Sequence, residues 1–191
     1  MKSLSSAYTN RRAFLKIGAS AMLATVWPFP VRAALGPERQ EYRILSFYNI
    51  HTGEQLKTCY RAKGRLIERS MQRINYILRD YRTGEIKPID PNLLDLLHCI
   101  VLEVKPHSPI NIISGYRSPR TNAALRRITT GVAKKSLHME GRAIDIRIPG
   151  YRTTALRKMA IGLKSGGVGY YPASDFIHLD TGPIKIWQQL Y

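Results

Sequence analysis

The sequence has little cysteine and no long apolar run. Its 191 residues include two cysteines, Cys59 and Cys99, and neither lies in a C-x-x-C or other paired spacing. Zinc ribbons and dithiol redox motifs are therefore excluded. We expect two unpaired thiols, with a disulfide between them as the alternative. No uninterrupted apolar stretch reaches the roughly 18 residues that a membrane-spanning helix needs, so we expect no transmembrane segment in the mature protein.

Acidic residues are also scarce. The 13 Asp and Glu are outnumbered by 30 Lys and Arg, which gives a formal net charge of +17. Five of these positive charges precede residue 34, where no acid occurs, so +12 remains on the rest of the chain. Such a bias favours anionic partners: nucleic acid, anionic lipid, or the acidic peptides and polymers of a bacterial wall. Charge alone does not choose among them.

Several signatures of other enzyme classes are missing. The sequence shows no Ser/His/Asp triad pattern, no phosphate-binding glycine loop and no dinucleotide fingerprint, and the glycines at 166, 167 and 169 are better read as a turn into a strand. It also contains no internal repeat, low-complexity tract or linker. Its length and its 44% hydrophobic content fit one packed domain.

The N-terminus has the form of an export signal. Arg11-Arg12 is followed by Phe and Leu, then by a short apolar run at 17–26, and Val31-Arg32-Ala33 has the small-x-small form of a cleavage site. A basic amphipathic helix is the alternative, but two prolines would break it. We therefore predict a twin-arginine signal peptide at 1–33 and one catalytic domain at 34–191. Export to the bacterial periplasm makes nucleic acid a poor partner.

The rest of the chain mixes both kinds of secondary structure. Period-two alternation and turn residues predict strands, while helical spacing and the cap-then-proline pairs Asp90-Pro91 and Ser118-Pro119 predict helices. The fold class expected is α+β, with helices packed on a small antiparallel sheet. The expected strands are 42–50, 55–61, 110–114, 142–148, 168–171 and 176–180, and the expected helices are 65–81, one opening at 90–91, 118–127 and 152–165.

Two histidines and an aspartate form the candidate site. His138 precedes the 142–148 strand, Asp145 lies on that strand's polar face, and His178 lies on the polar face of the 176–180 strand. If the two strands are neighbours, these side chains converge as a three-ligand set of the kind used by catalytic zinc, with a fourth position for water. The pair Tyr170-Tyr171 either lines the cleft beside this site or fills the core.

Three motifs in this order resemble a known family. They are S-x-H-x-x-G-x-A-x-D at 136–145, the late His178-Leu179-Asp180, and Ser-Gly-Tyr-Arg-Ser at 114–118. Together they resemble the zinc D-alanyl-D-alanine carboxypeptidases and related murein endopeptidases, which share a fold core with lysostaphin-like enzymes and the hedgehog domain. The similarity covers most of 42–187. An Asn-x-His-Thr-Gly-Glu hairpin at 49–54 is typical of the exported K-type endopeptidases of that family.

This resemblance implies roles for individual residues. His138, Asp145 and His178 would be the zinc ligands, and Asp175, three positions before the last histidine, would be the general base. That role requires Asp175 to lie in the loop before the strand. Arg117 would bind the scissile carbonyl oxygen or a substrate carboxylate, with a structural salt bridge as the alternative.

The function implied is zinc-dependent hydrolysis of peptide cross-links in murein, with peptidoglycan peptides as the substrate. A carboxypeptidase or dipeptidase acting on wall peptides would use the same metal site. A non-catalytic wall-binding protein that keeps zinc would also fit the motifs, and a contact between Asp175 and the attacking water would argue against it. The sequence leaves open whether the bond cut joins meso-diaminopimelate to D-alanine or to another meso-diaminopimelate.

Overall fold

A computed structural model describes residues 41–189 apart from residue 130. The predicted export signal at 1–33 lies outside the described residues. No helix in the described part of the chain is long and apolar enough to cross a membrane.

The elements of the first half follow the expected order. The helix caps form as predicted, since the Asp90 side chain accepts from the Asn92 amide at 2.9 Å and the Ser118 side chain accepts from the Thr121 amide at 3.2 Å. The elements are β1 (Tyr42–Asn49), β2 (Gln55–Ala62), β3 (Arg65–Leu66), α2 (Glu68–Ile77), α3 (Pro91–Val104), β4 (Ile110–Ser114) and α4 (Pro119–Ile128).

The second half adds one turn and one strand to those predicted. The elements are the 3₁₀ turn η2 (Leu137–Glu140), β5 (Ala143–Arg147), α5 (Thr153–Gly162), β6 (Gly167–Tyr171), β7 (Phe176–Asp180) and β8 (Lys185–Gln188). The expected helix at 65–81 is shorter than predicted, because residues 65–66 pair with β2 and the helix ends at Ile77.

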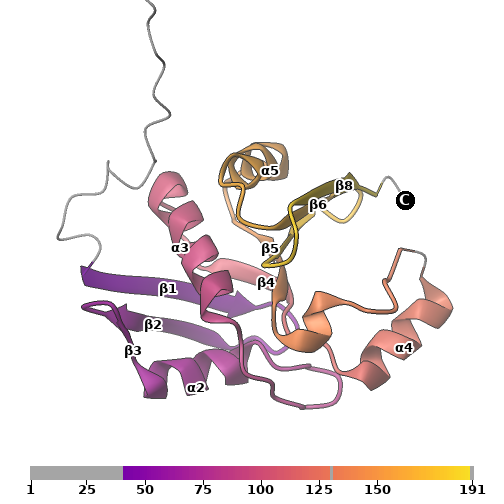
Figure 1. Cartoon of the computed structure of the whole chain (residues 1–191), viewed down its shortest axis with the longest axis horizontal. Coiled ribbons are helices and arrows are strands. Elements are labelled where there is room, and N and C mark those ends of the chain that lie inside the picture. Colours follow the sequence, from indigo (N-terminus) through magenta and orange to yellow (C-terminus); the bar gives the residue numbers. More distant parts are fainter. Residues whose placement is uncertain (1–40, 130, 190–191) are drawn as a thin grey trace, which may run out of the picture. The chain divides into compact units, whose positions relative to one another are not determined.

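The strands form one eight-stranded sheet in the order β3-β2-β1-β4-β5-β7-β6-β8. The α+β class is confirmed, but the sheet is larger than expected and mixed. Most neighbours are antiparallel, whereas β1 pairs with β4, and β6 with β8, in parallel. Figure 1 shows the chain passing through β2, α2 and α3 between β1 and β4, which is the crossover that a parallel pair requires.

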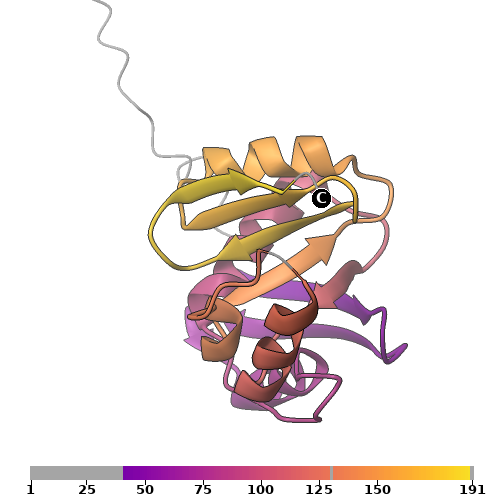
Figure 2. The same cartoon turned by 90° about the vertical axis from the view of Figure 1, so that its right-hand side faces the viewer.

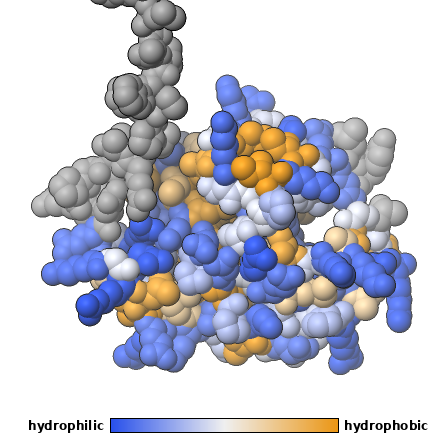
Figure 3. Space-filling model, in the orientation of Figure 1, coloured by the Kyte–Doolittle hydropathy of each residue, from blue (hydrophilic) through white to orange (hydrophobic). Residues whose placement is uncertain are grey.

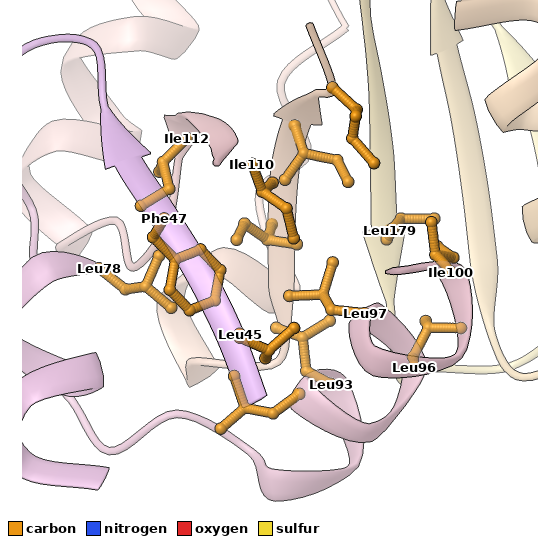
Figure 4. Close-up of a cluster of buried hydrophobic side chains, with 14 of the residues drawn as sticks. Leu45, Phe47, Leu78, Leu93, Leu96, Leu97, Ile100, Ile110, Ile112 and Leu179 are labelled. Carbon is orange, nitrogen blue, oxygen red and sulfur yellow. The ribbon is translucent and has the colours of Figure 1, made fainter. Parts of the chain in front are cut away.

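The core lies on one face of this sheet. Alternate residues of β1, β4, β5 and β7 point into it, and α3 packs across β1 while α5 packs on β6 and β7. Figure 4 shows leucines of α3 against Phe47, Ile110 and Leu179, three fully or almost fully buried side chains from three strands. The opposite face of β5 and β7 is therefore free to carry polar residues. The C-terminal strands lie beneath α5, and α4 lies in front of the sheet, in Figure 2.

The surface matches the composition. Hydrophilic residues predominate on the face drawn in Figure 3, with smaller apolar patches, one of them over α5. Cys59 is half-buried on β2 and Cys99 is exposed on α3, and both thiols are free, as expected.

Candidate metal centre

The three candidate ligands come from three adjacent pieces of backbone. Asp145 on β5 and His178 on β7 face each other directly in the antiparallel register, so alternation puts both on the polar face. His138 lies in η2, where the Ser136 hydroxyl accepts from the His138 amide at 3.4 Å. Gly141 ends the turn with a positive φ of 70°. The structure thus brings together the three residues that the motif predicted.

Their ligand atoms form a tight cluster. His178 Nδ1 lies 2.8 Å from Asp145 Oδ1 and 3.1 Å from His138 Nε2, and His138 Nε2 lies 3.3 Å from Asp145 Oδ1. Tetrahedral zinc with bonds of about 2.0–2.2 Å separates its ligand atoms by roughly 3.3–3.6 Å. All three residues are buried. The distance from His138 to Asp145 matches this range, and the other two are 0.2–0.5 Å shorter, so the two imidazole nitrogens and the carboxylate oxygen would hold a zinc ion after a small outward shift.

The histidine tautomers also fit a metal. His138 Nδ1 lies 2.7 Å from the Gly115 carbonyl oxygen, which can only accept, so Nδ1 carries the proton and Nε2 presents its lone pair to the cluster. Burial lowers the pKa of His138, against the opposing effect of Asp145. The ring is therefore neutral at physiological pH, as a ligand must be.

His178 is held by carboxylates on both sides. Its Nε2 donates to Asp180 Oδ2 at 3.1 Å, which leaves Nδ1 facing Asp145. Burial alone would lower the pKa of His178, but the hydrogen bonds to Asp145 and Asp180 raise it to about 9. A raised pKa means that Nδ1 also carries a proton, which a metal bound at Nδ1 would displace. The Asp180 contact would then fix the ring, as carboxylate partners commonly fix metal-binding imidazoles.

Arg117 reaches the same cluster from the turn after β4. Gly115 permits the close approach of this turn, because a Cβ there would lie 2.5 Å from the Leu78 carbonyl oxygen. The Ser118 amide donates to the buried Asp80 carboxylate at 2.9 Å, which anchors the turn to the loop that follows α2. The Arg117 amide donates to the His138 carbonyl at 3.1 Å, so the turn and η2 are joined directly.

The Arg117 guanidinium lies beside the candidate metal ligands. Its Nη2 is 3.6 Å from Asp145 Oδ2, and its other contacts, to Ser114 and Asn122, are long at 3.4 Å. Its Nε is buried with no hydrogen-bond partner among the described residues. The side chain is therefore close to the cluster and incompletely satisfied, which suits a group that binds a substrate oxygen.

Asp175 lies in the loop before β7, as its predicted role requires, but it is not joined to the cluster. It has a positive φ of 51°, and its carboxylate accepts from the Thr153 hydroxyl at 2.8 Å and pairs with Arg147 at 3.3 Å. No contact to His138, Asp145 or His178 is found among the described residues. The general-base role stays a prediction, and the observed contacts supply a structural alternative at the start of α5.

The structure also shows neighbours of the site that the sequence did not single out. Trp187 on β8 lies 5.1 Å from His178 between ring centroids, and its Nε1 donates to the Tyr171 hydroxyl at 3.1 Å. Asp80 holds the Arg117 turn. Residues 185–188 show no apolar-polar alternation and are mostly exposed, so nothing in the sequence indicated β8 or its pairing beside β6.

Comparison with known proteins supports one family. A family model described as "Peptidoglycan L,D-endopeptidase MepK" matches residues 38–187. The chain is 43% identical over 178 residues to "Peptidoglycan L,D-endopeptidase MepK" of Escherichia coli strain K12, covering 93% of this chain and 97% of the relative. It is 39% identical over 180 residues to "Probable peptidoglycan L,D-endopeptidase MepK" of Haemophilus influenzae, covering 94% and 96%.

Proposed function

The chain belongs to the peptidoglycan L,D-endopeptidase MepK family, and on that basis we propose that it is an exported zinc enzyme that hydrolyses peptide cross-links of murein. The observation that carries the proposal is the convergence of His138, Asp145 and His178, with Arg117 beside them. The names of its relatives favour an endopeptidase over a carboxypeptidase. They also favour the L,D bond, which joins one meso-diaminopimelate to another.

The residues divide the chemistry among them. When bound to these three side chains, zinc would supply Lewis acidity that activates a water and polarises the amide carbonyl. Arg117 would bind the carbonyl oxygen as negative charge builds up on it. Asp175 would accept a proton from the attacking water and pass it to the leaving amine, while the carbon–nitrogen bond breaks and a carboxylate forms. No covalent link to the protein is needed.

The position of Asp175 bears on the second candidate function. Its contacts with Thr153 and Arg147 would, taken alone, favour a wall-binding protein that keeps zinc without hydrolysis. The relatives that cover almost the whole chain are named as endopeptidases, and this favours the enzyme. For Asp175 to act as the base, its carboxylate must exchange the Thr153 hydroxyl for the attacking water.

Digestion of purified murein tests the proposal. The zinc-loaded protein should remove cross-linked dimers that join two meso-diaminopimelates, with products identified by mass. Chelation and His178→Ala should each abolish the reaction, whereas His107→Ala, at an exposed histidine outside the cluster, should not. Intact dimers, with the protein bound to the sacculus, would instead support the wall-binding function.

We also propose that the protein reaches the wall through the twin-arginine pathway and is cut near Ala33. Replacement of Arg11 and Arg12 by lysine, which keeps the charge, should leave the uncut precursor in the cytoplasm. Export of this variant at the normal rate would show that another route is used. The positive charge of the remaining chain would hold the enzyme near an anionic wall through screened, long-range attraction.

A further inference from the structure

An aromatic wall, defined here as Tyr171, Phe176 and Trp187, adjoins the candidate metal centre. Tyr171 and Phe176 are partners in the β6–β7 register, and their rings stack with centroids 4.5 Å apart. Trp187 is the partner of Gly169 on β6, and Gly169 is in turn the partner of His178. His178, Gly169 and Trp187 thus lie in one row across the strands. Because the glycine between them has no side chain, the indole can lie 5.1 Å from the His178 ring, measured between ring centroids.

Strand alternation separates the two adjacent tyrosines. Tyr170 is 9% exposed and belongs to the hydrophobic core, whereas Tyr171 is half-buried on the face that carries His178. Tyr170 thus fills the core, one of the two positions that the sequence offered for this pair, and Tyr171 lies on the face of the candidate site. The Tyr171 ring is fixed by its stack on Phe176, so its hydroxyl has a defined position.

The Tyr171 hydroxyl has a proton to donate. Trp187 Nε1 is a donor only, so in the 3.1 Å bond the phenol oxygen accepts. No acceptor for the phenol's own proton is found in the part of the chain that the structure describes. Burial raises the pKa of Tyr171, against the hydrogen bond from Trp187, and the charges of Asp145 and Arg117 also act on it. The hydroxyl is therefore protonated at working pH and lies within electrostatic range of the candidate site.

We infer that Tyr171 is a catalytic residue that donates a hydrogen bond to the carbonyl oxygen of the scissile amide and holds it as negative charge develops. The inference rests on the proposed hydrolysis. Arg117 comes from the β4 side of the cluster and Tyr171 from the β6 side, with Asp145 and His178 between them in the sheet order. An amide placed over the two ligands would have one donor on each flank. The phenol keeps its proton throughout.

Tyr171→Phe is the direct test, because it keeps the stacked ring and removes only the hydroxyl. Loss of one such donor typically lowers kcat by about 100- to 1,000-fold. We expect that fall with KM and zinc content unchanged. Tyr170→Phe is the matched control, since it makes the same change one residue away on the core face, and its kcat should stay at the wild-type level. Wild-type kcat in Tyr171→Phe would overturn the inference.

Binding of a transition-state mimic separates this inference from the proposed function. A phosphinate dipeptide has a tetrahedral, anionic centre in place of the amide, so Tyr171→Phe should lower its affinity at least tenfold while leaving the affinity of an uncleaved analogue with a planar amide unchanged. Equal loss for both ligands would reduce Tyr171 to part of the binding wall. A wild-type protein that cleaves no murein would refute the function, yet the phosphinate comparison would still decide the role of Tyr171.

Trp187→Phe tests the orientation of the hydroxyl. This variant keeps an aromatic ring beside His178 but removes the indole donor. The Tyr171 hydroxyl therefore keeps its proton but loses the hydrogen bond from Trp187 that orients it. We expect a fall in kcat smaller than that of Tyr171→Phe, and no further fall when both changes are combined. Full additivity of the two losses would show that Trp187 acts independently and would contradict the coupling.

Discussion

Asp180 accepts a hydrogen bond from His178 Nε2 at 3.1 Å through one carboxylate oxygen, while its other oxygen accepts from the amides of Gly167 and Gly182 at 2.9 and 2.8 Å. The carboxylate is therefore fixed by the backbone at the start of β6 and just after the end of β7, and it in turn fixes the imidazole. His178 presents Nδ1 to the other two candidate ligands because its Nε2 already donates to Asp180.

We predict that Asp180→Asn lowers zinc affinity about 10- to 100-fold, the usual effect of removing a carboxylate that orients a ligand imidazole. Competition with a chromophoric chelator measures the affinity. Asp95→Asn is the control, since Asp95 pairs with Arg43 and Arg61, outside the His138/Asp145/His178 cluster, and its loss should leave zinc binding unchanged. Equal zinc affinity in Asp180→Asn and wild type would contradict the orienting role.

Asp175→Asn should separate the two roles open to Asp175. A general base contributes about 10²- to 10⁴-fold to the rate, so its loss should lower kcat by that factor with little change in unfolding. If Asp175 instead only binds Thr153 and Arg147, kcat should stay at the wild-type value while the free energy of unfolding falls by about 1 kcal/mol. We expect the first result. Steady-state kinetics and urea unfolding of the same preparation distinguish them.

Gly169→Ala should disturb the aromatic wall, because a Cβ at this position would lie 2.6 Å from the Trp187 indole. We expect the free energy of unfolding to fall by about 1–3 kcal/mol, as overpacking usually costs, and kcat to fall as the Tyr171 contact shifts. The two tryptophans of the chain are Trp27 and Trp187, so in a protein that begins at residue 34 the fluorescence of Trp187 alone would report the displacement. In Gly162→Ala the added Cβ meets nothing within 4 Å, and neither loss should occur.

The Asp80 carboxylate should make the free energy of unfolding depend on pH below about pH 4. Burial alone would raise the pKa of Asp80, but hydrogen bonds from Thr121, Ser118 and Arg82 lower it below its ordinary value of 3.8. A carboxyl with a lowered folded pKa stabilises the fold above about pH 4 and loses that contribution as the pH falls further. Asp80→Asn should cost about 1–3 kcal/mol at pH 7 and much less at pH 3. An equal cost at both values, measured by urea unfolding, would contradict this assignment.

The sequence predicted the strands and helices that have a clear burial pattern. The hairpin of β1 and β2, the capped helices α3 and α4, and the alternating β5 and β7 all form near their expected residues. β3 and β8 were not predicted, because β3 has only two residues and β8 is a largely exposed edge strand with no half-buried periodicity. The parallel pairing of β1 with β4 depends on a long crossover, which local patterns do not reveal.

The residues of the candidate site also fall into those that the sequence could predict and those that it could not. His138, Asp145 and His178 could be found because a compact motif and strand alternation both point to them, and Arg117 because its turn has a recognisable sequence. Trp187 and Tyr171 could not be placed, since their proximity to His178 depends on which strands are neighbours in the sheet. The contacts of Asp175 with Thr153 and Arg147 join segments that no sequence spacing relates.

The direct pairing of Asp145 with His178 has a consequence for how the sheet assembles. If β7 slipped by one residue along β5, Ile177 or Leu179 would face Asp145 and the imidazole would turn towards α5. A misaligned sheet would thus lack the second nitrogen ligand. Under the proposed function, zinc would bind only the correctly aligned chain and would stabilise it by mass action. The metal would then select the correct strand register during folding as well as take part in the reaction. If the chain is exported in the folded state by the proposed twin-arginine route, correctly aligned molecules would be exported preferentially.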